Sequence, residues 1–542
     1  MTAAANNTTA RFAPARPGWR RLTLLFCLLL LAWALLLPKG TAVQWWHYAI
    51  AAAVTLAFVG SWHSQHFSTV TGRWVPMALH NRRQRTQRSK RSPAAGSHHN
   101  TPSRTAPDKP EPLQARIVVH LRPQPHQLTT AEDETDQLPW EFITSWLHRY
   151  GVRAVALDVC SITRTPPPSG LRSDSGSLVG GPNTQHHDTW LTYTLRAEDN
   201  VGALTARGTT MDTPIEALAD DQARGPHRTG LADTTARRLV AELRERGWLA
   251  TLGPDAGQAP QFVPDSATVR RETWTGTEYS DGFRAIYAVQ PDALRDVLKA
   301  LPTLNTKATW VLVTVRAHGN QPMTVEAAVG TLTASRPPRH LLAGLDGFHG
   351  NHRRLIPALG INGSGVPARE VARIPISVDD LAALRWPTSA KGIPIGFNRR
   401  RQPVYLGLAS PEPVRITVTG TRAFHVGVIA RLALWGMPIA LYTAEPRQWA
   451  ALANHAAPEQ FQMRPHTPDP EAIVVSDGSC EVPAGGAITV TLRRPQSAEP
   501  PATTIVITQN VTNPDLFDIS TADQRQLLSS RLATNAPRRQ AR

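Results

Sequence analysis

Residues 22–37 read LTLLFCLLLLAWALLL, and residues 45–62 read WWHYAIAAAVTLAFVGSW; these two apolar runs decide how the chain is organised. Neither run contains Asp, Glu, Lys or Arg. At about 1.5 Å per residue, the first run spans roughly 24 Å as a helix and the second somewhat more, which approaches the thickness of a bilayer core. We therefore predict a two-helix transmembrane hairpin over residues 22–62.

Basic residues flank this pair of runs on both sides. Arg20 and Arg21 precede the first run, and Arg82, Arg83 and Arg85 belong to a basic stretch after the second. Positive residues near a membrane span stay on the cytoplasmic side. We therefore expect a multi-pass protein of the cell inner membrane with both termini in the cytoplasm and a short loop outside.

A cleaved secretory signal peptide is the alternative interpretation of the first run, with a small-residue site near residues 40–42. The second apolar run follows at once, which disfavours cleavage. The Arg20-Arg21 pair would also fit a twin-arginine signal, but such pairs are common in so Arg-rich a chain.

The second run carries small residues that suit close packing against another helix. Small side chains let the backbones of membrane helices approach each other. The candidates for this packing are Ala49, Ala52, Ala53 and Ala57. Their partner would be the first helix or a neighbouring subunit.

Composition limits the classes of function. The 542 residues carry a net charge of +16, with much of the excess beside the membrane exit. Topology and anionic lipid explain a basic segment at that place, so nucleic-acid binding is the weaker interpretation. Cys27, Cys160 and Cys480 are too far apart for a disulfide framework or a zinc site, and we expect reduced thiols.

Composition shifts and hydrophobic periodicity predict a chain of both α/β and α+β class. Apart from the hairpin, the expected parts are a basic cytosolic N-terminus (1–21), a basic Pro/Ser-rich linker (63–112), a cytosolic α+β domain (113–335), a C-terminal α/β domain (336–510) and a tail (511–542). From residue 81 to about residue 113 the chain should be flexible, because it has few apolar side chains to bury. The tail should hold one weak helix over residues 521–532.

The first domain opens with strand, helix and strand patterns at residues 115–121, 138–150 and 153–160, which indicate a β-α-β start. The clearest helix covers residues 231–248, and Gly247 should end it. Its expected buried stripe is Leu231, Leu239, Val240 and Leu243, with Asp233 or Thr234 as the N-cap. Strands at 268–274, 282–289, 309–316 and 323–332, with a helix at 291–301, complete an α+β pattern.

The C-terminal domain contains a β-α-β unit, with strands at 414–418 and 437–443 around a helix at 422–435. A strand at 403–409 precedes it, and strands at 472–475, 488–492 and 504–508 could extend its sheet. A phosphate-binding loop after Gly420 would need Gly, then Lys, then Ser or Thr, but those positions hold His425, Val426 and Gly427. We predict an αβ module without a nucleotide.

Two groups of residues could bind a metal by composition. Asp346, His349 and His352 place two imidazoles near a carboxylate, but in a Gly-rich segment with no evident fourth ligand. The run His-His-Asp at residues 186–188 is a weaker case. We expect ordinary loop and strand roles for both groups, and no metal.

Three glycines and one carboxylate complete the candidates. Gly360, Gly363 and Gly365 resemble a dinucleotide fingerprint only loosely, because they neither follow a clear strand nor open a helix. Asp158 lies at the expected end of a strand, where carboxylates act in α/β enzymes, but no partner is evident. We therefore assign no catalytic or cofactor-binding residue, and we expect no cofactor.

A combination of segments resembles a known family. These segments are the Leu-rich two-helix start, the basic exit, TWLTYTLRAEDN at residues 189–200 and LADTTARRLVAELRERGWLA at residues 231–250. They are similar to EccE, the membrane component of actinobacterial type VII (ESX) secretion systems. The resemblance is best over residues 20–335, and the long linker and extended C-terminal part indicate a long form.

This resemblance implies a non-enzymatic structural subunit that takes part in protein export across the inner membrane. The implied partners are EccB, EccD and the EccC ATPase, which would supply the energy, with the mycosin protease as a further partner and no nucleic acid. The alternative from the residues is a membrane-tethered enzyme that uses a nucleotide or sugar nucleotide at the β-α-β unit.

Overall fold

The computed structural model describes residues 61–62, 65–90, 114–122, 126–130, 137–165, 186–207, 230–253, 261–264, 266–318, 321–361, 371–384, 386, 392–408, 410, 412–434, 437–456, 460–468, 472–483, 486–495 and 504–530, and residues 23, 26, 27, 45, 48 and 49. Most of the predicted hairpin therefore lies outside the described residues, as do Arg20, Arg21, Ala52, Ala53 and Ala57. Ala49 is described as helical and exposed. Within the described residues, no helix is both long and apolar enough to cross a bilayer.

The chain divides into two compact units. The described elements of the first are β1 (Ser61–Trp62), β2 (Gln65–His66), α3 (Phe67–Lys90), β9 (Val269–Thr273) and β10 (Gly276–Tyr279), with residues 348–354. β1 pairs antiparallel with β2, so residues 61–62, which we predicted to be the end of the second apolar helix, form a strand. β9 pairs antiparallel with β10.

Helix α3 corrects the prediction of a flexible segment from residue 81 to about residue 113, which is wrong for residues 81–90. Val70 and Met77 are buried. The Asn81 amide donates through Nδ2 to the Glu272 carbonyl (2.8 Å) and accepts through Oδ1 from the Glu272 N–H (2.9 Å). The Asn81 side chain thus completes the backbone pairing of β9, a tertiary contact that local composition does not indicate.

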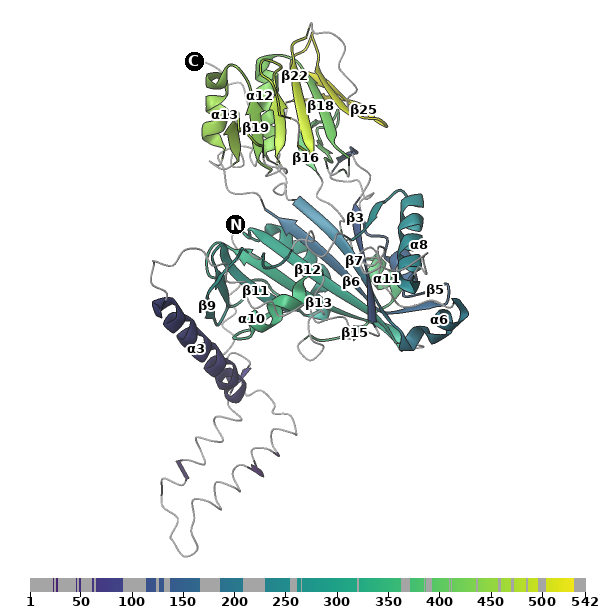
Figure 1. Cartoon of the computed structure of the whole chain (residues 1–542), viewed down its shortest axis with the longest axis vertical. Helices are drawn as coiled ribbons and strands as arrows, with labels where there is room; N and C mark the ends of the chain where they lie inside the picture. The colour runs from purple at the N-terminus through teal and green to yellow at the C-terminus, as the bar shows by residue number, and fades with distance from the viewer. Residues whose placement is uncertain are drawn as a thin grey trace, which may run out of the picture. The chain divides into compact units, whose positions relative to one another are not determined.

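The second unit contains two sheets, each described by itself. The strands of the first, in spatial order, are β8 (Leu249–Leu252), β3 (Gln114–Arg122), β7 (His186–Arg196), β6 (Val152–Arg164), β12 (Ala308–His318), β13 (Gln321–Thr333) and β11 (Gly282–Val289). Neighbouring strands are antiparallel throughout. The predicted β-α-β start is present in sequence order, but β7 lies between β3 and β6 (Figure 1).

Short strands and helices complete this first sheet region. The strands are β5 (His148–Arg149), β14 (Leu345–Gly347) and β15 (Ile374–Pro375), which pair with β6, β11 and β13. The helices are α4 (Trp140–Ser145), α6 (Val201–Arg207) after η1 (Glu198–Asn200), α8 (Leu231–Glu245), α9 (Leu294–Ala300) between η2 (Pro291–Ala293) and η3 (Leu301–Thr303), η4 (Ile356–Leu359) and α11 (Val378–Ala382). The short helix α10 (His352–Leu355) begins in the first unit and ends at the first residue of the second.

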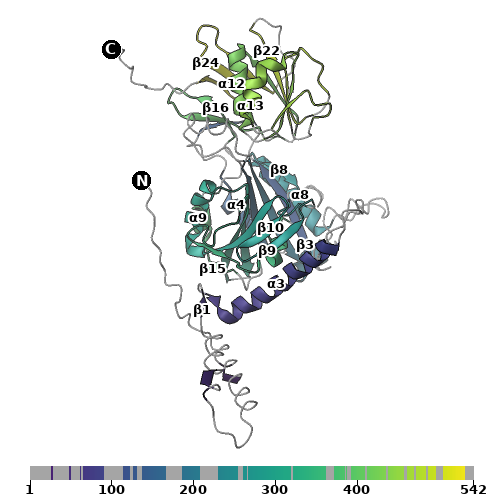
Figure 2. The same ribbon diagram turned by 90° about the vertical axis from the view of Figure 1, so that its left-hand side faces the viewer.

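Helix α8 lies beside β3 and β8 (Figures 1 and 2) and confirms most of its prediction. All four residues of the expected stripe are buried. Gly247 follows the helix with a φ of 84°, a left-handed conformation that suits glycine and stops the helix. The N-cap is Gly230, so the predicted caps Asp233 and Thr234 are wrong by several residues. Helix α4 is also shorter than predicted, because residues 148–149 pair as β5.

Part of the chain beyond residue 335 belongs to the core of the first sheet. Leu381, Leu384 and Trp386 are buried in the same apolar cluster as α8 and β3. The Trp386 ring meets Trp140 edge to face at 5.9 Å, and its carbonyl accepts from the Leu138 N–H (2.9 Å). Leu381, Leu384 and Trp386 therefore pack with the first sheet, although we expected them in the C-terminal domain.

The second sheet combines parallel and antiparallel strands. Their spatial order is β20 (Phe461–Met463), β19 (Ile439–Tyr442), β21 (Ile473–Ser476), β22 (Ile488–Arg493), β18 (Val414–Thr419), β23 (Ile505–Gln509), β24 (Leu516–Ser520), β25 (Arg525–Ser529), β16 (Ile393–Phe397), β17 (Pro403–Leu406) and β4 (Leu128–Thr130). The neighbours from β20 to β23 are parallel, and those from β23 to β4 are antiparallel.

The helices of this region are α12 (Arg422–Ala433), η5 (Pro446–Trp449) and α13 (Ala450–His455). The predicted β-α-β order β18–α12–β19 is confirmed, but β22 and β21 lie between its two strands. The helix predicted over residues 521–532 is wrong for the described residues, because Arg525–Ser529 form β25. Its Leu528 is buried beside the buried Phe517 of the paired strand, so sheet packing prevails over weak helix propensity.

A candidate docking site of arginines and aromatic rings

A tight hairpin presents Tyr150 at the surface of the first sheet region. Tyr150 and Gly151 both have positive φ, at 53° and 73°, and they connect β5 to β6. Two consecutive positive φ angles in a two-residue loop are typical of a type I′ turn, whose twist matches the flanking strands. A non-glycine residue in this conformation is unusual. Tyr150 is 42% exposed, so burial alone does not fix the position of its ring, and polar contacts contribute.

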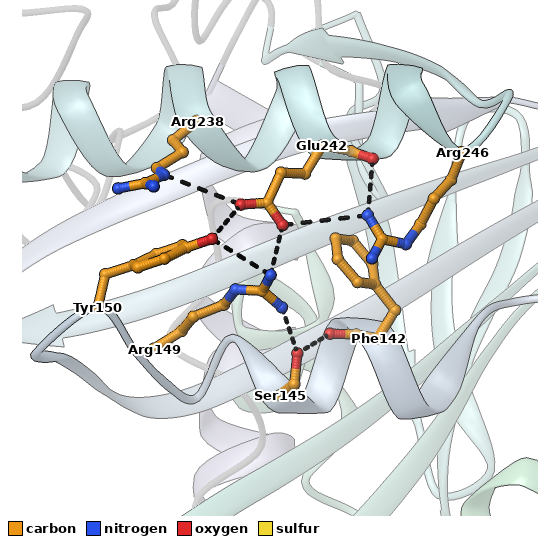
Figure 3. Close-up of polar contacts among 7 residues, drawn as sticks. All are labelled: Phe142, Ser145, Arg149, Tyr150, Arg238, Glu242 and Arg246. Carbon is orange, nitrogen blue, oxygen red and sulfur yellow. Dashed lines mark hydrogen bonds and ion pairs between the residues drawn. The ribbon is translucent and has the colours of Figure 1, made fainter.

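Glu242 of α8 provides those contacts (Figure 3). The Tyr150 hydroxyl donates to Glu242 Oε1 (2.7 Å), and Arg149 Nη2 donates to Glu242 Oε2 (2.7 Å). Arg238 Nε lies 3.8 Å from Oε1, and Arg246 Nη1 lies 4.0 Å from Oε2. These two arginines lie one turn before and one turn after Glu242 on the same helix face. One carboxylate, itself only 13% exposed, thus joins α8 to the β5–β6 hairpin.

Aromatic rings lie against the same guanidinium groups. Arg149 Cζ lies 5.0 Å from the Tyr150 ring centre and 5.3 Å from that of Trp146. Arg238 Cζ lies 3.5 Å from the Tyr150 ring centre, and Arg246 Cζ lies 3.9 Å from that of Phe142. Such cation–π contacts fix the guanidinium planes.

The cluster therefore combines excess positive charge with ordered rings. Three arginines face one carboxylate, and Arg238 and Arg246 remain about half exposed. Its residues are Phe142, Ser145, Arg149, Tyr150, Arg238, Glu242 and Arg246, which we call the arginine–aromatic cluster. Arginine and tyrosine are enriched among the residues that dominate protein interfaces. The arginines of this cluster could bind a negatively charged group, and its rings could bind a planar group.

At the Gly420–Thr421 turn, where the sequence raised the question of a phosphate-binding loop, the backbone N–H groups already donate to other groups of the chain. The Gly420 N–H donates to the Arg493 carbonyl (3.0 Å), and the Thr421 N–H donates to Gln509 Oε1 (2.7 Å). The Phe424 N–H is capped by Thr421 Oγ1 (3.4 Å). A Cβ at Gly420 would lie 2.7 Å from Phe424 and 2.9 Å from Gln509. Side chains of the chain itself thus fill the space over the amides that a phosphate would need.

The residues at the three phosphate-loop positions, His425, Val426 and Gly427, lie in α12 and have structural roles. His425 is buried and its Nε2 lies 3.1 Å from the Arg493 carbonyl oxygen. Burial lowers the pKa of His425, so the imidazole is neutral at physiological pH. Val426 is partly buried in the apolar core. Gly427 lies within α12 with open space around its Cα.

The residues considered for metal binding make other contacts. The rings of His349 and His352 lie 6.1 Å apart, and His349 stacks on Trp274 at 6.1 Å. Asp346 accepts a hydrogen bond from Gln290 Nε2 (3.0 Å). Among the described residues, no group of three or more His, Cys, Asp or Glu side chains could hold a metal ion.

Residues 186–188 lie on β7, where neighbouring side chains point to opposite faces. His187 contacts the hydroxyls of Ser161 (2.7 Å) and Thr163 (2.8 Å). Asp188 lies 3.2 Å from His120 Nε2 on the neighbouring strand, and the His120 ring stacks on Trp190 at 4.0 Å. His187 and Asp188 thus make separate cross-strand contacts.

Asp158 is not at a strand end, which corrects its prediction. It lies inside β6, and Thr314 of β12 donates a hydrogen bond to its Oδ1 (2.5 Å). Burial raises the pKa of Asp158, and the Thr314 hydrogen bond opposes that shift. Two positions along β6, Cys160 is buried, and burial and Asp158 raise its pKa to about 12. All three cysteines are free thiols.

The remaining candidates are the three glycines of the loose dinucleotide pattern and the arginines after the second apolar run. Gly360 follows η4 in an extended conformation, whereas Gly363 and Gly365 lie outside the described residues. Arg82 and Arg83 are exposed on α3, and Arg85 belongs to the same helix.

Comparison with known proteins identifies the family. The chain is 30% identical over 385 residues to the ESX-3 secretion system protein EccE3 of Mycobacterium tuberculosis, an alignment that covers 70% of this chain and 95% of that protein. The chain belongs to the EccE family. It is also 28% identical over 360 residues to EccE3 of Mycolicibacterium smegmatis, covering 64% of this chain and 92% of that protein. No family model matches this EccE-family chain.

Sequence reasoning missed the arginine–aromatic cluster of this EccE-family chain. The signal it overlooked was Phe142, Trp146 and Tyr150, which follow one another at intervals of four residues beside Arg149. That spacing indicates one aromatic face, although the structure forms it from a short helix and a hairpin.

Proposed function

We propose that this chain is a non-enzymatic structural subunit of an ESX (type VII) secretion complex in the cell inner membrane, with a role in protein export. The observation that carries the proposal is the 30% identity to an ESX-3 secretion system protein over 95% of that protein's length. The closed turn between β18 and α12 supports a non-enzymatic role, because its amides are already satisfied by Arg493 and Gln509.

The proposed anchor is the hairpin of residues 22–37 and 45–62, with both termini in the cytoplasm. The absence of charge in both runs and the basic flanks support it. In the assembled complex, Ala49, Ala52, Ala53 and Ala57 would let the second helix approach a neighbour. Replacing Ala52 and Ala53 with Leu should then loosen assembly without preventing membrane insertion, and unchanged co-purification would contradict this packing role.

The proposed partners are EccB, EccD and the EccC ATPase, with the mycosin protease as a further partner. The arginine–aromatic cluster supports docking on another subunit, since it presents fixed guanidinium groups and a half-exposed tyrosine. A carboxylate-bearing or aromatic surface on the partner would fit its charge and rings.

Gentle detergent extraction followed by affinity purification and mass spectrometry tests the assignment. A tagged chain expressed in its own host should recover EccB, EccC and EccD from intact membranes. If a stably folded, membrane-retained chain recovers none of these subunits, the proposed membership in the complex is wrong.

A pair of double variants tests the docking site. Arg238→Glu with Arg246→Glu reverses the two exposed charges of the cluster and should reduce the recovery of partner subunits several-fold. The matched control, Arg295→Glu with Lys299→Glu, reverses two exposed charges on α9 and should leave recovery unchanged. Equal loss in both variants would indicate a general charge effect and not a docking site.

The alternative, a membrane-tethered enzyme that uses a nucleotide, predicts that ligand stabilises the folded chain. We expect ATP, GTP and UDP-sugars to leave the melting temperature of the purified chain unchanged, because Gln509 and Phe424 fill the space at the β18–α12 turn. A reproducible rise in melting temperature with any of them would count against the structural role.

A further inference from the structure

Helix α3 has a second apolar face, which the contacts of its own unit do not use. Val70 and Met77 on one side are buried. Val75 and Leu79 on the other side are 48% and 52% exposed, and Trp74, at the edge between the two sides, is 56% exposed. Exposed Trp and Leu side chains placed together are costly in water, and such patches mark interaction surfaces.

Helical geometry arranges this face in two parallel rows. Residues four apart are neighbours on a helix surface. One row is therefore Trp74, Ala78 and Arg82, and the other is Val75, Leu79 and Arg83. Each row begins apolar and ends with an exposed arginine. The face is apolar toward the helix N-terminus and basic toward the C-terminus.

Three further properties of α3 point to the kind of surface that covers this face. The helix begins at Phe67, five residues after the second apolar run ends, and five residues reach at most about 17 Å. The sequence from Phe67 to Lys90 contains six Arg or Lys residues and no Asp or Glu. Tryptophan prefers the headgroup region, where its ring is partly apolar and its N–H finds partners.

We propose that the exposed face of α3 lies on an anionic lipid bilayer, with Trp74, Val75 and Leu79 at the acyl boundary and Arg82 and Arg83 at lipid phosphates. This proposal rests on the membrane anchor proposed above. A helix with an apolar stripe and basic residues lies parallel to the membrane surface, with the apolar stripe toward the acyl chains and the basic residues at the headgroups. Asn81, one turn after the buried Met77, holds β9, so α3 connects the bilayer surface to folded structure of its own unit.

Site-specific fluorescence on the full-length chain tests the proposal. The purified chain is reconstituted into vesicles of phosphatidylcholine and phosphatidylglycerol, with no other subunit present. Leu79→Cys is labelled with bimane in a Cys27→Ser, Cys480→Ser background. Cys160 can stay, because it is buried and its pKa is raised to about 12. The matched control is Val511→Cys, at a position that is 90% exposed between β23 and β24.

The bimane at Leu79→Cys should be quenched several-fold more by lipids with a nitroxide on the acyl chain than by aqueous iodide. The label at Val511→Cys should show the reverse. Vesicles of pure phosphatidylcholine, or the added changes Arg82→Glu and Arg83→Glu, should reduce the lipid quenching at Leu79→Cys.

Two results would overturn the proposal while leaving the anchor intact. In vesicles that retain the chain through alkaline carbonate extraction, the Leu79→Cys label could be quenched by iodide as strongly as the Val511→Cys label. It could instead be shielded from both quenchers, which would assign the face to a second copy of the chain. Release of the chain by carbonate would contradict the anchor itself, and this proposal with it.

Discussion

Glu242 is the residue on which the arginine–aromatic cluster depends. It accepts hydrogen bonds from Arg149 and from Tyr150, whose backbone has a positive φ. Glu242→Gln removes the charge that pairs with a partly buried guanidinium, which should lower the free energy of unfolding by about 1 to 3 kcal/mol. Chemical denaturation followed by tryptophan fluorescence measures this change.

The control for this prediction is Glu245→Gln on the same helix. Glu245 is exposed, and a surface change of this kind should alter stability by less than about 0.5 kcal/mol. Equal destabilisation by the two substitutions would show that Glu242 has no special role in holding the hairpin.

Asp158 should make stability depend on pH. Burial raises its pKa in the folded state above that of the unfolded chain. Its contribution to stability is therefore complete below the unfolded pKa of about 4 and is lost as the pH rises through the folded-state pKa. The Asn side chain of the Asp158→Asn variant cannot ionise, so the variant does not lose stability in this way as the pH rises. The stability of the variant relative to the parent chain should increase between about pH 4 and pH 7.

Melting temperatures of both chains across this pH range check the sign. Asn keeps the Oδ1 atom that accepts the hydrogen bond from Thr314, so the comparison isolates ionisation. A difference that stays constant with pH, or that decreases as pH rises, would contradict the predicted effect of burial.

At the scale of elements, α3 depends on its connection to β9. Asn81 makes two hydrogen bonds to the backbone of Glu272. Its side-chain amide thus pairs with the N–H and carbonyl of Glu272 as the backbone of a neighbouring strand would. Asn81→Ala leaves both Glu272 groups without this partner, and amide hydrogen exchange in α3 and β9 should become faster. Thr86→Ala is the control, because the Thr86 hydroxyl donates to the Arg82 carbonyl within the same helix. Faster exchange in the control alone would refute the prediction.

The elements also show where local patterns are reliable. Helix α8 was predicted because its buried stripe repeats with the helical period, and packing on the sheet preserves that pattern. β25 was mistaken for a helix because its five residues carry little periodic signal. The length of α4 was overestimated because Tyr150 and Gly151 reverse the chain in a tight turn inside the predicted helix and at its end.

At the scale of the whole molecule, the segment after residue 510 is part of a folded sheet. Phe517 and Ile519 of β24 and Leu528 of β25 are fully or almost fully buried. A chain that ends at residue 510 loses these side chains from the core, each contributing about 1.5 to 3 kcal/mol. We expect it to melt at a much lower temperature or to aggregate.

The control for the truncation is a chain that ends at residue 530. It keeps every described strand and the Ser530 carbonyl that accepts a hydrogen bond from Arg431. Its melting temperature should match that of the full chain. If the chain ending at residue 510 were equally stable, β24 and β25 would not be integral to this sheet.

Local sequence by itself determined the two apolar runs, helix α8, the order β18–α12–β19 and the lack of lysine at the phosphate-loop position, because each follows from residues close together in the chain. Tertiary structure alone decided that β7 lies between β3 and β6, that β4 pairs with β17, and that Glu242 meets Arg149 and Tyr150. Strand pairing and side-chain packing join distant residues, and their free energy comes from contacts that no local period encodes.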